Sequence, residues 1–146
     1  MIIDNLEITG ALQISLNNEV VHQCDNLVVT AGKEWVAGRF KDGSIPAEMS
    51  HMALGSGSAA AAAGNTALGT ELASSRIVLT TDGGTVSNAT VQYDATWTSS
   101  HGAYAIEEAG IFNAASGGTM LARTVFAIIN KGTDDTVTIS WTITVS

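Results

Sequence analysis

The sequence has little of the two residue types that most often constrain small or secreted proteins. It contains one cysteine, Cys24, and one proline among 146 residues. A single cysteine cannot form a disulfide within the chain, so we expect no disulfide framework. We interpret Cys24 as a half-buried strand residue, because free cysteine usually packs as a small apolar side chain. Stability must then come from a packed core, which a chain of this length can form as a single domain, residues 1–146.

Basic residues are also scarce. Lys and Arg number 6 against 14 Asp and Glu, which gives a formal net charge of −8. Nucleic-acid-binding proteins neutralise phosphates with clustered cationic side chains, so this balance excludes a nucleic-acid-binding module. Charged residues make up only 14% of the chain and hydrophobic residues 45%. That composition excludes a disordered chain and a charged coiled coil, and it indicates a globular protein.

Long hydrophobic runs are missing as well. No segment approaches the roughly 18 consecutive apolar residues of a membrane-spanning helix. The first residues, Met1-Ile2-Ile3-Asp4, lack the basic and apolar regions of a signal peptide. We therefore expect neither membrane insertion nor secretion.

Alternation of apolar and polar residues is the strongest positive signal. Residues 136–146 read TVTISWTITVS, in which every second residue from Val137 to Val145 is apolar. Residues 90–98 (TVQYDATWT) and the apolar series Leu6, Ile8, Leu12, Ile14 and Leu16 repeat the pattern. A period of two indicates strands with one buried face. Gly10 stands in the apolar register of the N-terminal series and marks a bulge or a site of close backbone approach.

Shorter strands are expected between turn-like sequences. They span residues 19–24, 49–54, 76–80, 104–112 and 120–129. The turns are Asn17-Asn18, Asp25-Asn26, Asp82-Gly83-Gly84, Ser116-Gly117-Gly118 and Lys131-Gly132. Together with the three alternating strands, these make seven or eight strands, which predict an all-β fold, an antiparallel β-sandwich that is Ig-like or jelly-roll-like, with one short helix. A closed barrel is the alternative.

The single helix is expected over residues 31–40. Thr30 would be its N-cap, and Trp35, Val36 and Phe40 would form its packing face. The following segment, GSGSAAAAAG at residues 55–64, carries no charge. We interpret it as a flexible or extended small-residue loop at about 55–66, with a short helix as the alternative. Long loops on compact β domains are frequent sites of contact with other chains.

Motifs for catalysis or metal binding are not evident. His22, His51 and His101 are far apart and fit no metal-ligand spacing. The sequence Gly55-Ser56-Gly57-Ser58 is similar to a phosphate-binding loop, but no Gly-Lys-Ser or Gly-Lys-Thr follows it. We therefore assign no catalytic, cofactor-binding or metal-binding residue and expect a protein that is not an enzyme and needs no cofactor.

Glu107 and Glu108 are the remaining candidates for acid–base chemistry. Adjacent strand residues face opposite sides of a sheet, so the two carboxylates do not form a catalytic pair. We expect one to be solvated and the other to be structural. We also expect one of the two to form an ion pair with Arg123 or Arg76, two of the few cations in the chain.

The positions of the tryptophans test whether the chain could bind sugars. Trp97 and Trp141 lie in the apolar registers of their strands, which predicts positions in the core. A carbohydrate-binding module would need an exposed aromatic platform, so this function is an alternative of a different class that the sequence disfavours.

From residue 52 onward, segments rich in glycine, alanine and threonine follow one another in a particular order. They read MALGSGSAAAAAGNTALGTELASSR, then AYAIEEAGIFNAASGGTMLARTVF, then TVTISWTITV. This order resembles small structural proteins of tailed bacteriophages over about the last two-thirds of the chain. The match is carried by Leu54-Gly55, residues 65–72 with Arg76, and residues 108–113, 117–123 and 136–145.

The resemblance implies a non-enzymatic virion component. The small size of the chain and its lack of fibrous repeats lead us to expect a capsid decoration (cement) protein. It would be assembled in the host cytoplasm and would bind and stabilise the lattice of the major capsid protein on the capsid surface. A tail, collar, baseplate or fibre-attachment component is the alternative. Small residues and open strand edges favour self-association, so we expect a homo-oligomer, a dimer or trimer.

Overall fold

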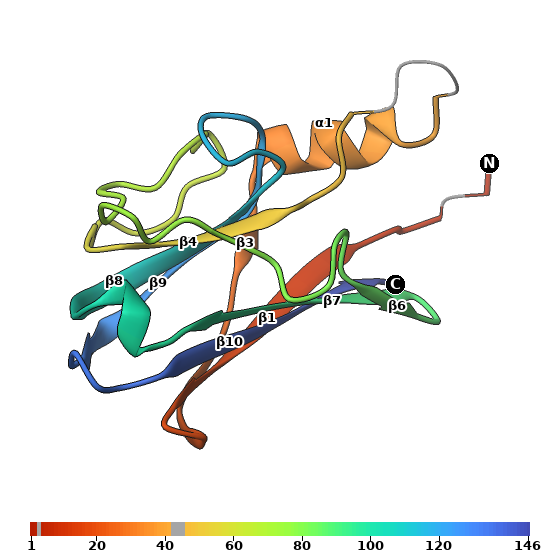
Figure 1. Ribbon diagram of the computed structural model, residues 1–146. Coiled ribbons are helices and arrows are strands. Elements are labelled where there is room, and N and C mark those ends of the chain that lie inside the picture. Colours follow the sequence, from red (N-terminus) through yellow and green to blue (C-terminus); the bar gives the residue numbers. More distant parts are fainter. Residues whose placement is uncertain (3, 42–45) are drawn as a thin grey trace.

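Two antiparallel sheets of five strands each pack face to face as a sandwich (Figure 1). The structure is a computed structural model and describes residues 1–2, 4–41 and 46–146. The first sheet, called here the β1 sheet, has the order β2 (Glu19–Asp25), β1 (Ile8–Leu16), β10 (Val137–Val145), β7 (Thr90–Trp97), β6 (Thr85–Ser87). The second, the β9 sheet, has the order β3 (Leu27–Val28), β9 (Met120–Lys131), β8 (Tyr104–Phe112), β4 (His51–Gly55), β5 (Ile77–Val78). The predicted antiparallel sandwich is therefore confirmed.

The last strand in the sequence is the central strand of its sheet. β10 pairs with β1 from Leu16 opposite Val137 to Ile8 opposite Val145, and it pairs with β7 on its other side. The alternating apolar residues of β10 face the second sheet, and its Thr and Ser residues form the outer face. The pattern that predicts this strand thus also determines which face is buried.

Trp97 and Trp141 are fully buried between the sheets, as the apolar registers predict. The Trp97 indole N–H donates to the carbonyl of Ser75 at 2.6 Å. The Trp141 indole N–H donates to Asn26 Oδ1 at 2.7 Å. Each ring therefore buries a large apolar area without leaving its one donor unpaired.

Gly10 is a site of close approach, one of the two roles predicted for it. A Cβ at this position would overlap Asn26 Oδ1, the acceptor for Trp141. Glycine at position 10 thus makes room for the amide that receives the indole N–H. The register irregularity of the first hairpin lies elsewhere, between Ile14 and Ser15. Leu6 was expected in the strand but lies before β1 and is exposed. Backbone hydrogen bonds between Glu7 and Ser146 extend the pairing one residue beyond Ile8 but do not include Leu6.

The helix α1 spans Thr30–Gly38 and packs beside β9. Val29, rather than Thr30, occupies the N-cap position, and no side chain caps the helix. The Thr30 amide instead donates to the backbone carbonyl of Ala63 at 2.8 Å, so the segment predicted as a loop supplies the missing acceptor. Trp35 and Val36 pack against the core as expected. Phe40 does not, because it lies beyond the end of the helix and is 82% exposed.

Several predicted strands have different limits in the structure. The strand expected at 76–80 contributes only the two residues of β5, and the strand at 49–54 begins later, at His51. β3 and β6 were not predicted, since two or three residues give no detectable alternation. A short 3₁₀ helix, η1 (Ser99–His101), links β7 to β8. Within the described residues, no helix is long and apolar enough to cross a membrane.

Candidate functional site

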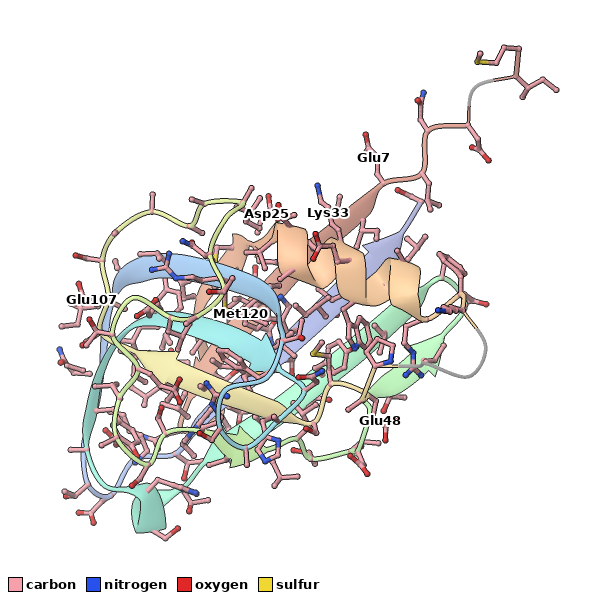
Figure 2. The ribbon with its side chains drawn as sticks, turned by 90° about the horizontal axis from the view of Figure 1, so that it is seen from above. Glu7, Asp25, Lys33, Glu48, Glu107 and Met120 are labelled. Atoms are coloured by element: carbon pink, nitrogen blue, oxygen red, sulfur yellow. The ribbon has the colours of Figure 1, made fainter. Side chains whose placement is uncertain are left out.

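The segment between β4 and β5 forms a further layer over the β9 sheet (Figure 1). Residues 56–70, called here the cover loop, run across the face that points away from the β1 sheet. Leu68 is buried on this face in a second apolar cluster. The cluster is made up of Val29, Ala53, Leu68, Phe112 and Met120, with Ala31 packed against it. Figure 2 looks onto this side, with Met120 near the middle and α1 beside it.

Glu108 projects from β8 on the same face and lies beneath the cover loop. Its Oε1 accepts hydrogen bonds from the amides of Gly57 at 2.9 Å and Thr70 at 2.7 Å. Its Oε2 accepts one from the amide of Gly69 at 2.9 Å. Arg123 on β9 donates to Oε2 through Nε at 2.8 Å, and its Nη2 lies 2.8 Å from the same oxygen in an ion pair. Hydrogen-bond donors from the cover loop and from β9 therefore occupy both oxygens of the carboxylate.

Arg123 extends the same network to the first half of the loop. Its Nη2 donates to the carbonyl of Ala59 at 3.0 Å. Its Nη1 donates to Asn65 Oδ1 at 2.9 Å and to the carbonyl of Ala60 at 3.4 Å. The side chains of Arg123 and Glu108 are 3% and 0% exposed. A buried ion pair is tolerated when further hydrogen bonds satisfy both ions, and here the loop backbone supplies those bonds.

The predicted ion pair is thus confirmed with Arg123 as the partner. Arg76 pairs with Glu71 instead, at 2.6 Å, and its guanidinium lies 3.7 Å above the centre of the Phe112 ring. Glu107 is half-buried at the margin of the molecule (Figure 2). The cover loop is irregular, which excludes the helical alternative, and its hydrogen bonds to the buried pair fix its position.

Glycines bring the loop backbone close to the carboxylate. A Cβ at Gly55 or Gly57 would overlap Glu108 Oε1, and one at Gly57 would also lie 3.0 Å from the Cα of Gly69. A Cβ at Gly69 would lie 3.1 Å from Arg123 Nη2. At Gly64, by contrast, a Cβ would meet nothing within 4 Å. Space therefore requires glycine at positions 55 and 57 and leaves little room at 69, whereas position 64 is open.

The surroundings of Glu108 keep it ionised. Burial by itself raises the pKa of this carboxyl group, but the amides of Thr70 and Gly69, the Arg123 guanidinium and the amide of Gly57 together hold the pKa below its ordinary value. The carboxylate is enclosed and fully hydrogen-bonded. Its role is to hold the loop, and it is not placed to transfer protons to a ligand.

The outer side of the cover loop is exposed, small and uncharged. We call it the small-residue plate, and it consists of the exposed residues Ser58, Ala59, Ala60, Ala62, Ala63, Gly64, Thr66, Ala67, Gly69 and Thr70. Its chemistry is that of methyl groups, hydroxyls and backbone amides. The surface therefore presents small side chains and backbone hydrogen-bonding groups and no charged group.

The three histidines lie on different elements. His22 on β2 packs against Phe126, with ring centroids 5.4 Å apart, and His101 in η1 accepts a hydrogen bond from the Thr98 amide at 3.0 Å. Ser50 Oγ lies 2.8 Å from His51 Nδ1, a contact between neighbours that sequence reasoning did not anticipate. In the part of the chain that the structure describes, no three His, Cys, Asp or Glu side chains are grouped to hold a metal ion.

A shallow hollow of about 740 Å³ lies on the outer face of the β1 sheet. Amide, hydroxyl and small side chains line much of it, among them Gln13, Gln23 and Thr142. Trp97 and Trp141 are buried on the opposite face of the same sheet. The aromatic platform that sugar stacking requires is therefore not supplied by the residues that line this hollow.

No protein-family model, curated protein or solved structure matches this chain.

Proposed function

We propose that this chain is a non-enzymatic structural protein of a tailed-phage virion. In this role it is a capsid decoration (cement) protein that binds the lattice of the major capsid protein through the small-residue plate. One observation carries the proposal. Most of the segments that carry the sequence resemblance, although far apart in the chain, come together around the cover loop: Leu54-Gly55, residues 65–72, Arg76, Glu108 and Arg123.

The plate has properties that suit docking to a rigid protein lattice. The buried ion pair fixes its backbone before binding, so little conformational entropy remains to be lost on contact. Alanine, glycine and serine side chains also lose little rotamer freedom. The absence of charge in residues 58–70 lets a protein of net charge −8 approach another acidic surface there with little repulsion. Many such contacts, repeated over a lattice, add up to firm attachment.

Counting the copies of the chain in purified virions tests the proposal. Quantitative mass spectrometry gives the ratio of this chain to the major capsid protein. We expect a ratio near one to one, or a simple lattice fraction of it. A handful of copies per particle would favour the alternative location in the tail, collar or baseplate. Complete absence from virions would overturn both.

A pair of alanine variants tests the surface itself. Ala67→Arg places a long charged side chain on the plate, whereas Ala89→Arg places the same side chain in the turn between β6 and β7, where Ala89 is also exposed. Capsids that lack the chain should bind the Ala89→Arg variant with the same affinity as the unmodified protein. They should not bind the Ala67→Arg variant. Equal binding of the two variants would show that the plate is not the docking surface.

A further inference from the structure

A hollow of about 470 Å³ opens at the end of the sandwich where α1 and β6 lie (Figure 1). We call it the end hollow. Both sheets and the second half of α1 contribute to its walls. Most of the side chains that line it are apolar or aromatic, among them Trp35, Val36, Met49, Val91, Tyr93 and Ile143. Its volume lies within the range of about 300–1,000 Å³ that is usual for small-molecule pockets, which share this mainly apolar lining.

Trp35 forms one wall of the end hollow and is held there by contacts of its own. Its indole N–H donates to the carbonyl of Ala47 at 2.8 Å. The guanidinium of Arg39 lies 5.5 Å from the centre of its ring, and Arg39 Nη1 donates to the carbonyl of Pro46 at 2.8 Å. The wall is therefore formed before any ligand binds, and the guanidinium beside it already has a ring and a carbonyl as partners.

Tyr93 brings a polar group into the end hollow from β7. The residue is 3% exposed, and its phenol O–H forms no hydrogen bond with any residue that the structure describes. Burial raises the pKa of Tyr93 to about 12, so the phenol stays neutral at physiological pH. Arg39 lowers and Glu48 raises the same pKa, which places the phenol near both groups. A buried tyrosine O–H usually has a hydrogen-bond partner, and a ligand in the end hollow would supply one.

Glu48 and Asp82 make the rim of the end hollow negative. Glu48 lies at this end of the molecule (Figure 2). A Cβ at Gly83 would lie 2.6 Å from Glu48 Oε2, so this carboxylate lies against the turn that carries Asp82. The ion pairs of the described residues involve neither carboxylate. Two carboxylates against the single guanidinium of Arg39, in a chain of net charge −8, attract a cation and repel an anion.

We propose that the end hollow binds a small organic cation with an apolar body and an ammonium group. The body would pack between Trp35 and the apolar side chains of the two sheets. The ammonium group would donate a hydrogen bond to the Tyr93 oxygen and lie beside the carboxylates of Glu48 and Asp82. The aromatic rings that line the hollow add a further attraction for a cation. An anion of the same shape would meet two carboxylates, and a neutral molecule would leave them without a counter-charge.

Three probes with the same hydrocarbon body test this assignment: phenylpropylamine, phenylpropanol and phenylpropanoate. At neutral pH they carry an ammonium, a hydroxyl and a carboxylate group. Binding is measured by NMR titration of the full chain, from the shifts of the Trp35 indole N–H and of the amides of Gly83 and Gly84, which line the hollow. We expect the amine to bind with a Kd of about 1 mM or below. The alcohol should bind about fivefold more weakly and the carboxylate more weakly still.

Two variants remove a carboxylate at different places. Glu48→Gln acts at the rim of the end hollow, whereas Glu19→Gln acts at the exposed start of β2, outside the hollow. Both lower the net negative charge by the same amount, so a difference between them reports on position. Glu48→Gln should weaken binding of the amine about threefold or more and leave binding of the alcohol unchanged, whereas Glu19→Gln should change neither. Tyr93→Phe should weaken binding of the amine by about threefold to tenfold, because the hydrogen bond to the ammonium group is lost.

The proposal is overturned if no probe gives saturable shifts of these signals at about 10 mM. It is also overturned if the alcohol binds as tightly as the amine, or if Glu19→Gln and Glu48→Gln weaken binding of the amine equally. Tightest binding of the carboxylate would assign the end hollow to an anion held by Arg39. Circular dichroism and a thermal melt check that each variant is folded. The pure protein is used throughout, so the result does not depend on the virion role.

Discussion

Glu108 joins three parts of the chain: β8, which carries it, Arg123 on β9, and the amides of the cover loop. The interpretation of Glu107-Glu108 as one structural and one solvated carboxylate could be made from strand geometry alone. The choice between Arg123 and Arg76 as partner could not. It depends on the register of β8 against β9, which shifts between Ile106 and Glu108 and places Gly110 opposite Arg123.

Replacing Glu108 by glutamine should destabilise the fold strongly. The change leaves Arg123 buried without a counter-ion, and removing one partner of a buried pair typically costs about 3–5 kcal/mol. Urea unfolding followed by tryptophan fluorescence measures the loss in the free energy of unfolding. The matched control is Glu107→Gln at the neighbouring position, which should change that free energy by about 0.5 kcal/mol or less. Similar values for the two variants would contradict the role given to Glu108.

The lowered pKa of Glu108 also predicts how stability depends on pH. Because the pKa is lower in the folded state than in the unfolded state, this group stabilises the fold fully above its unfolded pKa, at about 4.3. The contribution is lost as pH falls through the lower, folded pKa. Unfolding free energies measured from pH 7 downward should therefore decrease in acid, and the decrease should be smaller in Glu108→Gln. An equally steep decrease in the variant would assign the acid sensitivity to other carboxylates.

At the level of elements, the cover loop shows how a segment without regular secondary structure is held in place. Its lack of charge and its small residues predicted an irregular loop. Its attachment to the sheet depends on contacts between residues 38 to 64 positions apart in the chain, such as Thr70 with Glu108 and Ala59 with Arg123. Local sequence patterns contain no signal for such contacts.

Two glycines of this segment provide a matched test. Gly57→Ala should destabilise the protein by about 1–3 kcal/mol, because the added methyl group has no room beside Glu108 and Gly69. Gly64→Ala should be neutral or stabilising by up to about 1 kcal/mol, since space is open there and alanine restricts the unfolded chain. Thermal and urea unfolding of both variants measure the difference. Equal effects would mean that the loop does not approach the carboxylate closely.

At the level of the whole molecule, the first and last strands of the chain, β1 and β10, are neighbours inside the β1 sheet. β10 lies between β1 and β7, so its removal would leave both without their central partner. A chain that ends at residue 136 should therefore be unfolded by circular dichroism. Deleting residues 1–5 should change the melting temperature little, because Met1 and Ile2 are fully exposed and extend away from the body beyond Glu7 (Figure 2). A cooperative melt of the chain without residues 137–146 would contradict this account.

The sequence by itself determined the class of fold, because a strict period of two fixes both the extended backbone and the buried face of a strand. It also determined that Trp97 and Trp141 lie in the core. Only the tertiary structure decided which arginine neutralises Glu108, where the cover loop lies, and which residues line the end hollow. The reason is physical: periodicity is a property of neighbouring residues, whereas ion pairs, loop attachment and cavities depend on segments that meet only in the folded chain.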